Sequence, residues 1–389
     1  MSVFPRAFTR NTPVRVRLRR GAQVLALFVV ACADPSGPST HLHPQRLLIP
    51  GTEEGAVVVD LDWRGIIRRS GPRFLSQGPG AISGRGELIT VGRIQGDATV
   101  MAGLDIDTGL ELWRTALSQG TSPVVVDGVE PGATMIAANP SRAEVFLWQS
   151  TQNGIAGVAG YDYERRRITR FIGPLGNRFR GMAAIPATAA HPDGCVVLGI
   201  DSGPPANTRA FFHVVCGASY AERDSVPIAL PSRFVVQMET SSDGRELLVM
   251  TDIELLKLDA ATMEVKVRAT RPLAAPFFRS RATGRLIIPD VGSSVVASTG
   301  IIYLLDANLE LSSIIDLRVL PFGERPLGIL GAEESRDGKW LYIVGGVPRD
   351  GPLYGPERTH VLVIDKSTGM VVDTVNLETF GGGRPILVP

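Results

Sequence analysis

Residues 102–113 read AGLDIDTGLELW and residues 361–372 read VLVIDKSTGMVV, and these two stretches decide the fold. In each, an apolar run ends in an aspartate, Asp105 or Asp365, and a Thr-Gly turn leads into a second run. An aspartate in such a turn can accept backbone N–H bonds, and glycine supplies the positive φ of a bulged turn. The pattern therefore predicts two antiparallel strands joined by a tight turn, with the aspartate in a structural role.

This turn recurs along the chain and alternates with a second one. Apolar runs end in aspartate at Asp60, Asp105, Asp162, Asp259, Asp306 and Asp365. The second turn precedes an apolar run and reads SGRG at 83–86, NPSR at 139–142, PDG at 192–194, SDG at 242–244, ATG at 282–284 and RDG at 336–338. The alternation has a period of roughly 40 to 60 residues, which is typical of propeller blades. Runs rich in Val, Ile and Leu between Gly/Pro turns favour strands over helices.

Each repeat is interpreted as four strands, A to D, with the second turn between A and B and the aspartate at the end of C. A seventh strand C is expected at 211–216, where Cys216 takes the place of the aspartate. The repeats begin at 46–50 with a strand B and end at 384–389 with a strand A. Joining the two removes exposed sheet edges. The sequence predicts an all-β fold over residues 46–389. It is a single seven-bladed β-propeller of four-stranded antiparallel blades, closed by the C-terminal strand completing the first blade.

The repeats resemble the YVTN-type and quinoprotein-like repeats of exported bacterial propellers across residues 46–389. The stretch TGLELW at 108–113 is close to the quinoprotein repeat, whose Trp docks between blades, although the other units lack that Trp. The resemblance implies a WD40-like propeller. Such repeats serve enzymes, scaffolds and binding modules alike, so the fold does not give the function.

The N-terminal residues predict export. Six arginines up to Arg20 precede the apolar stretch 21–31, which is too short to span a bilayer but fits the core of a signal peptide. VVAC at 29–32 resembles the lipobox of bacterial lipoproteins, which implies cleavage before Cys32 and a diacylglycerol on its thiol. We expect a signal peptide at 1–31, a lipid-anchored flexible tether at 32–45, and a place in the cell envelope, facing the periplasm or the outer surface. A plain secretory signal with a chance cysteine and twin-arginine export are the alternatives.

The amino-acid composition and the absence of certain motifs exclude several classes of function. A net charge of +1 over 389 residues gives no basic face for nucleic acid. No nucleophile motif or phosphate-binding loop is found, and only five histidines occur. We expect no cofactor and no catalytic residue, and a monomer that binds a partner.

Two function classes remain. The first is an envelope-anchored lipoprotein that acts as a binding or scaffolding module, similar in outline to the propeller lipoprotein of the outer-membrane assembly machine. The second is an enzyme of the lactonase or streptogramin-lyase type, with His, carboxylate or metal ligands converging on the central channel. The few histidines favour the first.

Two cysteines and two histidines are weighed as metal ligands: His191, Cys195, His213 and Cys216. The expected hairpin of 195–201 with 210–216 places Cys195 opposite Cys216. His213, three residues from Cys216, points to the other face. We therefore expect no metal site and a cross-strand disulfide, which an oxidising compartment favours. Two unlinked buried thiols are the alternative.

The B–C and D–A loops share one face of a propeller and carry the irregular segments: 115–131, 173–180, 202–208, 317–326 and 345–359. Loops on a rigid scaffold often carry function. We expect this face to hold a protein partner or an anionic ligand, with Arg349, Tyr354 and Arg358 of the longest B–C loop contributing. Solvated insertions without function are the alternative.

An arginine stands near the start of most innermost strands: Arg73, Arg180, Arg233, Arg271, Arg325 and Arg384. Because these strands converge on the axis, the side chains could ring the channel mouth and bind carboxylate or phosphate. In the alternative, each arginine turns sideways and bridges neighbouring blades.

Overall fold

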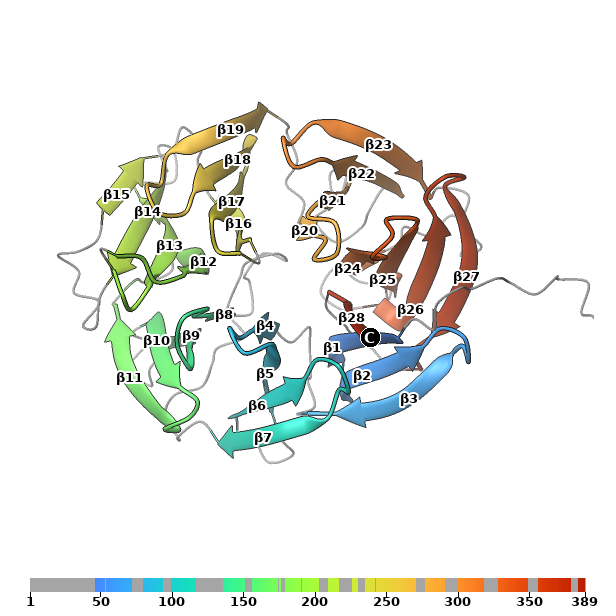
Figure 1. The fold of residues 1–389 in the computed structure, drawn as a ribbon, viewed down its shortest axis with the longest axis horizontal. Helices are drawn as coiled ribbons and strands as arrows, with labels where there is room; N and C mark the ends of the chain where they lie inside the picture. Colours follow the sequence, from blue (N-terminus) through green and yellow to red (C-terminus); the bar gives the residue numbers. More distant parts are fainter. Residues whose placement is uncertain are drawn as a thin grey trace, which may run out of the picture. The chain divides into compact units, whose positions relative to one another are not determined.

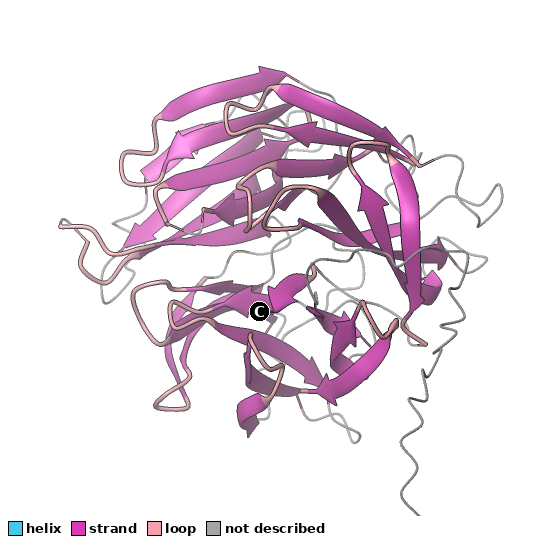
Figure 2. Cartoon of the chain, turned by 45° about the vertical axis from the view of Figure 1, so that its right-hand side comes forward, coloured by secondary structure: helices cyan, strands magenta, loops and turns pink. Residues whose placement is uncertain are grey.

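The computed structural model describes most of residues 46–388. The described residues are 46–52, 54–71, 80–93, 99–116, 136–150, 156–173, 175, 179–189, 191–202, 209–216, 226–229, 235–241, 243–270, 277–290, 300–317, 328–348, 356–378 and 384–388. The chain divides into two compact units, 1–42 and 43–389, and all described residues lie in the second. Every regular element in these ranges is a strand (Figure 2). Within these ranges, no helix has the length and apolar character needed to cross a membrane.

The strands form seven four-stranded antiparallel sheets, numbered here as blades in chain order and listed from the axis outward (Figure 1). Blade 1 comprises β28 (Ile386–Val388), β1 (Arg46–Thr52), β2 (Gly55–Asp60) and β3 (Gly65–Ser70). Blade 2 comprises β4 (Gly80–Ile82), β5 (Glu87–Arg93), β6 (Thr99–Asp105) and β7 (Glu111–Ala116). Blade 3 comprises β8 (Ile136–Ala138), β9 (Glu144–Ser150), β10 (Ala156–Asp162) and β11 (Arg167–Ile172). Blade 4 comprises β12 (Phe179–Ile185), β13 (Cys195–Ser202), β14 (Arg209–Cys216) and β15 (Val226–Ala229).

The remaining three blades follow the same order. Blade 5 comprises β16 (Val235–Thr240), β17 (Glu246–Thr251), β18 (Glu254–Asp259) and β19 (Val265–Thr270). Blade 6 comprises β20 (Phe278–Arg279), β21 (Leu286–Pro289), β22 (Ile301–Leu305) and β23 (Leu311–Asp316). Blade 7 comprises β24 (Gly328–Glu334), β25 (Trp340–Pro348), β26 (Pro356–Asp365) and β27 (Met370–Asn376). The predicted all-β, seven-bladed propeller is confirmed.

The last strand closes the ring. β28 pairs with β1, with Leu48 opposite Ile386 and Arg46 opposite Val388. The C-terminal strand therefore completes the first blade as the innermost of its four strands, which confirms the predicted closure. The pairing also gives blade 1 the four strands of every other blade and removes an open edge from β1.

Seven hydrophobic clusters hold the blades together, and each lies between two consecutive blades. Leu47 and Ile49 pack against blade 7, whereas Leu48, between them, packs against blade 2. Alternate residues of one strand thus serve two interfaces, which is why the middle strands are apolar on both faces. All six residues of β2 are buried for this reason.

The repeated aspartates fasten the turns between the two outer strands. Asp105 Oδ1 accepts N–H bonds from Asp107 at 2.8 Å and Thr108 at 2.9 Å, and Gly109 takes a φ of +66°. The other five also accept backbone bonds within their own turns: Asp60, Asp162, Asp259, Asp306 and Asp365. The predicted structural role of these aspartates is confirmed.

Candidate functional site

Four charged residues from four blades meet between the innermost strands, and we name them the axial cluster: Glu239 (β16), Arg281 (following β20), Glu333 (β24) and Arg384 (preceding β28). Arg384 Nη1 donates to Glu239 Oε1 at 2.6 Å, and its Nη2 donates to Glu333 Oε2 at 3.4 Å. Arg384 belongs to blade 1 and Glu239 to blade 5. These blades share no hydrophobic cluster, so this ion pair reaches across the space that the ring encloses.

Glu333 is the anchor of the axial cluster. Its side chain is 1% exposed, and its carboxylate accepts the backbone N–H of Arg281 at 2.9 and 3.1 Å and that of Glu334 at 3.0 Å. A buried carboxylate is tolerated only when it is bonded and its charge is compensated, and Arg384 supplies the compensation. Glu333 therefore links blades 1, 6 and 7.

The two arginines of the axial cluster differ in their surroundings. Burial acts to lower the pKa of Arg384, but Glu239 and Glu333 outweigh it and raise that pKa above its ordinary value. Burial, and secondarily the charge of Arg384, lower the pKa of Arg281 to about 10, although the two glutamates act in the opposite direction. A pKa of about 10 still leaves Arg281 a cation at neutral pH.

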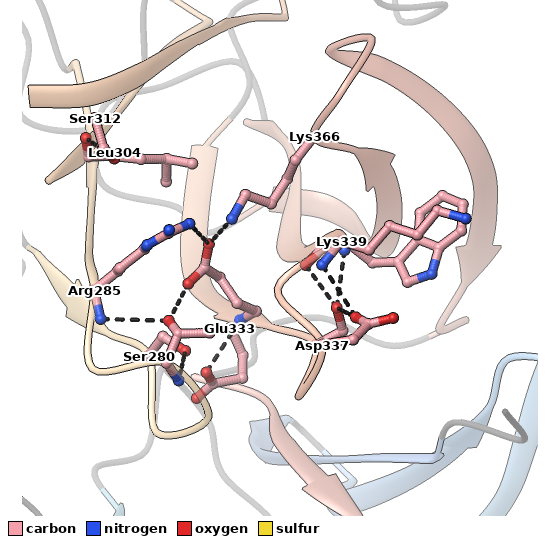
Figure 3. A network of polar contacts seen from close by, with 12 residues as sticks. Ser280, Arg285, Leu304, Ser312, Glu333, Asp337, Lys339 and Lys366 are labelled. Carbon is pink, nitrogen blue, oxygen red and sulfur yellow. Dashed lines mark hydrogen bonds and ion pairs between the residues drawn. The ribbon is translucent and has the colours of Figure 1, made fainter. Parts of the chain in front are cut away.

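A second carboxylate joins blades 6 and 7 beside the axial cluster. The Glu334 side chain is fully buried and pairs with Lys366, whose own side chain is 10% exposed. Arg285 Nη1 lies 3.8 Å from the same carboxylate, and the Thr283 hydroxyl donates to it. In Figure 3, the side chains of Arg285 and Lys366 point toward each other, and both lie within ion-pair distance of the Glu334 carboxylate. The sequence interpretation missed Glu334; the signal available was a pair of glutamates at the end of an innermost strand.

The structure describes two side chains of the predicted arginine ring. Arg180 Nε donates to Asp201 Oδ2 at 2.5 Å, within blade 4, and Arg384 is held in the axial cluster. Both guanidinium groups are therefore paired with carboxylates. The other four positions lie outside the described residues: Arg73, Arg233, Arg271 and Arg325.

The predicted binding loop belongs to the longest hairpin among the described strands. β25 has 9 residues and β26 has 10, and their pairing continues to Val347 opposite Arg358 and Pro348 opposite Pro356. Arg349 and Tyr354 lie between these strands, outside the described residues. The predicted loop 345–359 is shorter than expected because strand pairing extends into it from both sides, and Arg358 lies in β26 and not in a loop. Only the backbone of Arg358 is described.

The two cysteines of blade 4 face each other across β13 and β14. Cys195 pairs with Cys216, their sulfur atoms are bonded at 2.03 Å, and their Cα atoms are 4.2 Å apart. The predicted disulfide is thus present in the structure. Cys216 occupies the place of the turn aspartate, since Asp105 and Asp259 end the corresponding strands of blades 2 and 5.

A histidine completes a group of metal-ligating side chains at this disulfide. His191 lies in the turn before β13, and a ring nitrogen of His191 and both sulfur atoms lie within 4.8 Å of one another. His213, also weighed in the sequence, pairs with Leu198 inside the sheet and is not part of the group. The sequence predicts no metal site, and its pattern does not indicate that the turn before β13 brings His191 back to the two cysteines.

No protein-family model matches the chain, and no curated protein matches it. Among solved structures it is similar to the dihydro-heme d1 dehydrogenase NirN in complex with DHE, with a TM-score of 0.51, 12% identity, and coverage of 88% of this chain and 74% of that one. It is also similar to the Cps50 (Swd1) β-propeller domain of Myceliophteria thermophila, with a TM-score of 0.48, 12% identity and coverage of 85% and 89%. A protein of unknown function from Bacteroides caccae has a TM-score of 0.41, 12% identity and coverage of 88% and 99%. At this identity the likeness shows the fold alone.

Proposed function

We propose that this chain is an envelope-anchored lipoprotein whose propeller acts as a binding or scaffolding module. The observation that carries the proposal is the β25–β26 hairpin, the longest among the described strands, which belongs to a ring fastened by seven hydrophobic clusters. A rigid ring can present a projecting loop without losing its own structure. The partner or ligand is held on the face of the B–C and D–A loops, with Arg349, Tyr354 and Arg358 in contact with it.

The arginines of the loop face bear on the charge of the proposed ligand. Arg180 and Arg384 are each paired with carboxylates, so these two act within the scaffold. An anionic ligand on the loop face would therefore be recognised by Arg349 and Arg358, together with the remaining members of the proposed ring. Guanidinium groups suit this role because they stay charged and offer forked donors.

Site-specific photo-crosslinking tests the binding face. A photoreactive amino acid at Tyr354 is compared with one at Thr262, which is exposed in a turn between strands C and D. We expect a discrete adduct in intact cells from position 354 and none from position 262. Equal adducts from both positions, or an adduct from 262 alone, would contradict a binding site on the loop face.

The proposed anchor rests on Cys32 and the tether, which are tested separately. Metabolic labelling with an alkyne fatty acid is expected to mark the wild-type protein and to place it in the membrane fraction. Cys32→Ser should lose the label and leave the membrane, whereas the control Cys195→Ser/Cys216→Ser should keep both. Label retained in Cys32→Ser would refute the anchor without affecting the binding-face experiment.

The axial cluster supports one alternative, a lactonase- or lyase-type enzyme with its site in the central channel. Glu239 is 27% exposed and lies beside a second charged residue, Arg281, so a carboxylate and a cation are both near the axis. The test is hydrolysis or elimination of a panel of lactones by wild type and Glu239→Gln. Turnover by wild type that Glu239→Gln abolishes would favour the enzyme over the binding module.

A further inference from the structure

We propose that His191, Cys195 and Cys216 form a redox-gated metal site. In the oxidised state the two cysteines are joined as a disulfide. In the reduced state their thiolates and the His191 imidazole bind a thiophilic divalent cation such as Zn²⁺. This inference is independent of the binding function proposed above.

The geometry of the group is close to what a tetrahedral zinc site needs. Bonds of about 2.3 Å to sulfur and about 2.0 Å to nitrogen place neighbouring ligand atoms roughly 3.5 to 3.8 Å apart. The three ligand atoms already lie within 4.8 Å of one another. The two sulfur atoms, bonded at 2.03 Å in the oxidised state, have to move apart to reach this spacing, and reduction of the disulfide permits that movement.

The surrounding structure holds the ligands in place in both states. β13 and β14 pair over eight positions, from Cys195 opposite Cys216 to Ser202 opposite Arg209. His191 is fixed by backbone bonds, since its N–H donates to Thr188 and its carbonyl accepts from Thr188 and Gly194. The ligand set is thus assembled by a hairpin and a turn before any metal arrives.

The three ligand residues differ in burial, and this difference bears on how the metal enters the site and why it is retained. Cys195 and Cys216 are 5% and 4% exposed and belong to the hydrophobic cluster between blades 4 and 5. His191 is exposed and lies on the solvent side of the pair. Two thiolates without a cation are unfavourable in an apolar setting, so metal binding is what permits both to lose their protons.

The chemical step balances as a thiol–disulfide exchange followed by metal binding. A dithiol reductant attacks the Cys195–Cys216 bond, is itself oxidised to a disulfide, and leaves two protein thiols. Zn²⁺ then replaces two thiol protons, which are released to solvent. Three protein ligands leave a fourth position for water.

Cobalt binding to the full chain tests the proposal, because Co²⁺ bound to thiolate gives a charge-transfer band that aquo-Co²⁺ lacks. The reduced chain, freed of reductant without air, should bind one Co²⁺ with this band and release it to Zn²⁺. The oxidised chain should show no band. Cys32→Ser is included throughout so that its thiol cannot account for the signal.

Histidine variants separate a built site from a pair of reactive thiols. His191→Ala should weaken Zn²⁺ binding to the reduced chain by more than about 10-fold, since even partners outside the ligand set can contribute that much. His213→Ala is the matched control, on the same hairpin, and should bind as wild type does. Equal affinity in His191→Ala and wild type, or an absent band in the reduced chain, would overturn the proposal.

Discussion

The buried pair of Glu334 and Lys366 gives the sharpest test of how the blades are fastened. Glu334 is fully buried, Lys366 is 10% exposed, and the pair links blade 7 to the Thr283 hydroxyl of blade 6. Glu334→Leu leaves the ammonium group without a compensating charge. Removing one partner of a buried pair costs about 3 to 5 kcal/mol of unfolding free energy.

This loss of unfolding free energy corresponds to a decrease in melting temperature, whose size depends on the number of residues in the propeller. An unfolding entropy of about 2.1 cal/mol/K per residue over roughly 340 residues predicts a decrease of about 4 to 7 °C. The assay is thermal unfolding followed by circular dichroism, with the urea midpoint as a second measure. Glu334→Gln keeps an acceptor for the Thr283 hydroxyl and should lose less, about 1 to 3 kcal/mol.

Two further variants decide whether the unpaired charge of Lys366 causes the loss of stability in Glu334→Leu. Glu334→Leu/Lys366→Met removes both charges and should recover most of the loss, because an apolar pair of similar volume avoids the desolvation cost. Arg285→Met should cost at most about 1 kcal/mol, since Arg285 is 44% exposed and 3.8 Å away. A double variant that melts no higher than Glu334→Leu would show that the unpaired charge is not what destabilises the fold.

Three further outcomes are expected. The pKa of Asp259 is lowered from 3.8 to about 2 by Lys266 and by backbone bonds in its turn, so its contribution to stability is present above pH 3.8 and is lost as the pH falls toward 2. Asp259→Asn should therefore flatten the plot of unfolding free energy against pH over that interval. An unchanged slope in the variant would contradict this contribution of Asp259. Peptide mapping without reductant should find Cys195 joined to Cys216. Because the two residues are separated by 21 positions, reduction should lower the unfolding free energy by about 3 kcal/mol. Alkylation of both thiols in the untreated protein would show that the disulfide is absent. Deletion of 384–388 removes β28 from blade 1 and should make β1 sensitive to limited proteolysis. Deletion of residues 1–31 is the control and should not change the protease resistance of β1. Equal protease resistance in the two deletion variants would argue against closure of the ring by β28.

The fold was predictable because its signals are local and repeated. Each turn aspartate bonds the backbone within its own turn, so residues such as Asp105 reveal a strand pair without knowledge of the rest of the chain. The same reasoning placed Cys195 opposite Cys216, since register in a hairpin follows from its turn. Closure by the C-terminal strand followed from counting strands.

The axial cluster was not predictable because its partners are distant in sequence. Arg384 was singled out, but its acceptors Glu239 and Glu333 come from blades 5 and 7 and are brought to it only by the geometry of the ring. The position of Arg384 in the repeat indicated that it lies near the axis, whereas nothing in the repeat indicated Glu239 or Glu333 as its partners. His191 was weighed as a ligand, but its closeness to the cysteines was not predictable for a related reason, since the path of its turn, and not the strand register, returns it to them.

The pairing of β28 with β1 also fixes the order in which this protein can be completed. Leu48 and Ile386 lie 338 positions apart in the sequence, so blade 1 has no innermost strand until residues 386–388 have been synthesised. Contacts this remote in sequence are slow to form, and an unpaired strand edge invites aggregation while it waits. Two of the seven hydrophobic clusters, those of blade 1 with blades 7 and 2, include residues of this last segment or its immediate neighbours. A nascent chain therefore depends on protection of β1 until residues 386–388 have emerged, and any change to that segment acts directly on the closure of the ring.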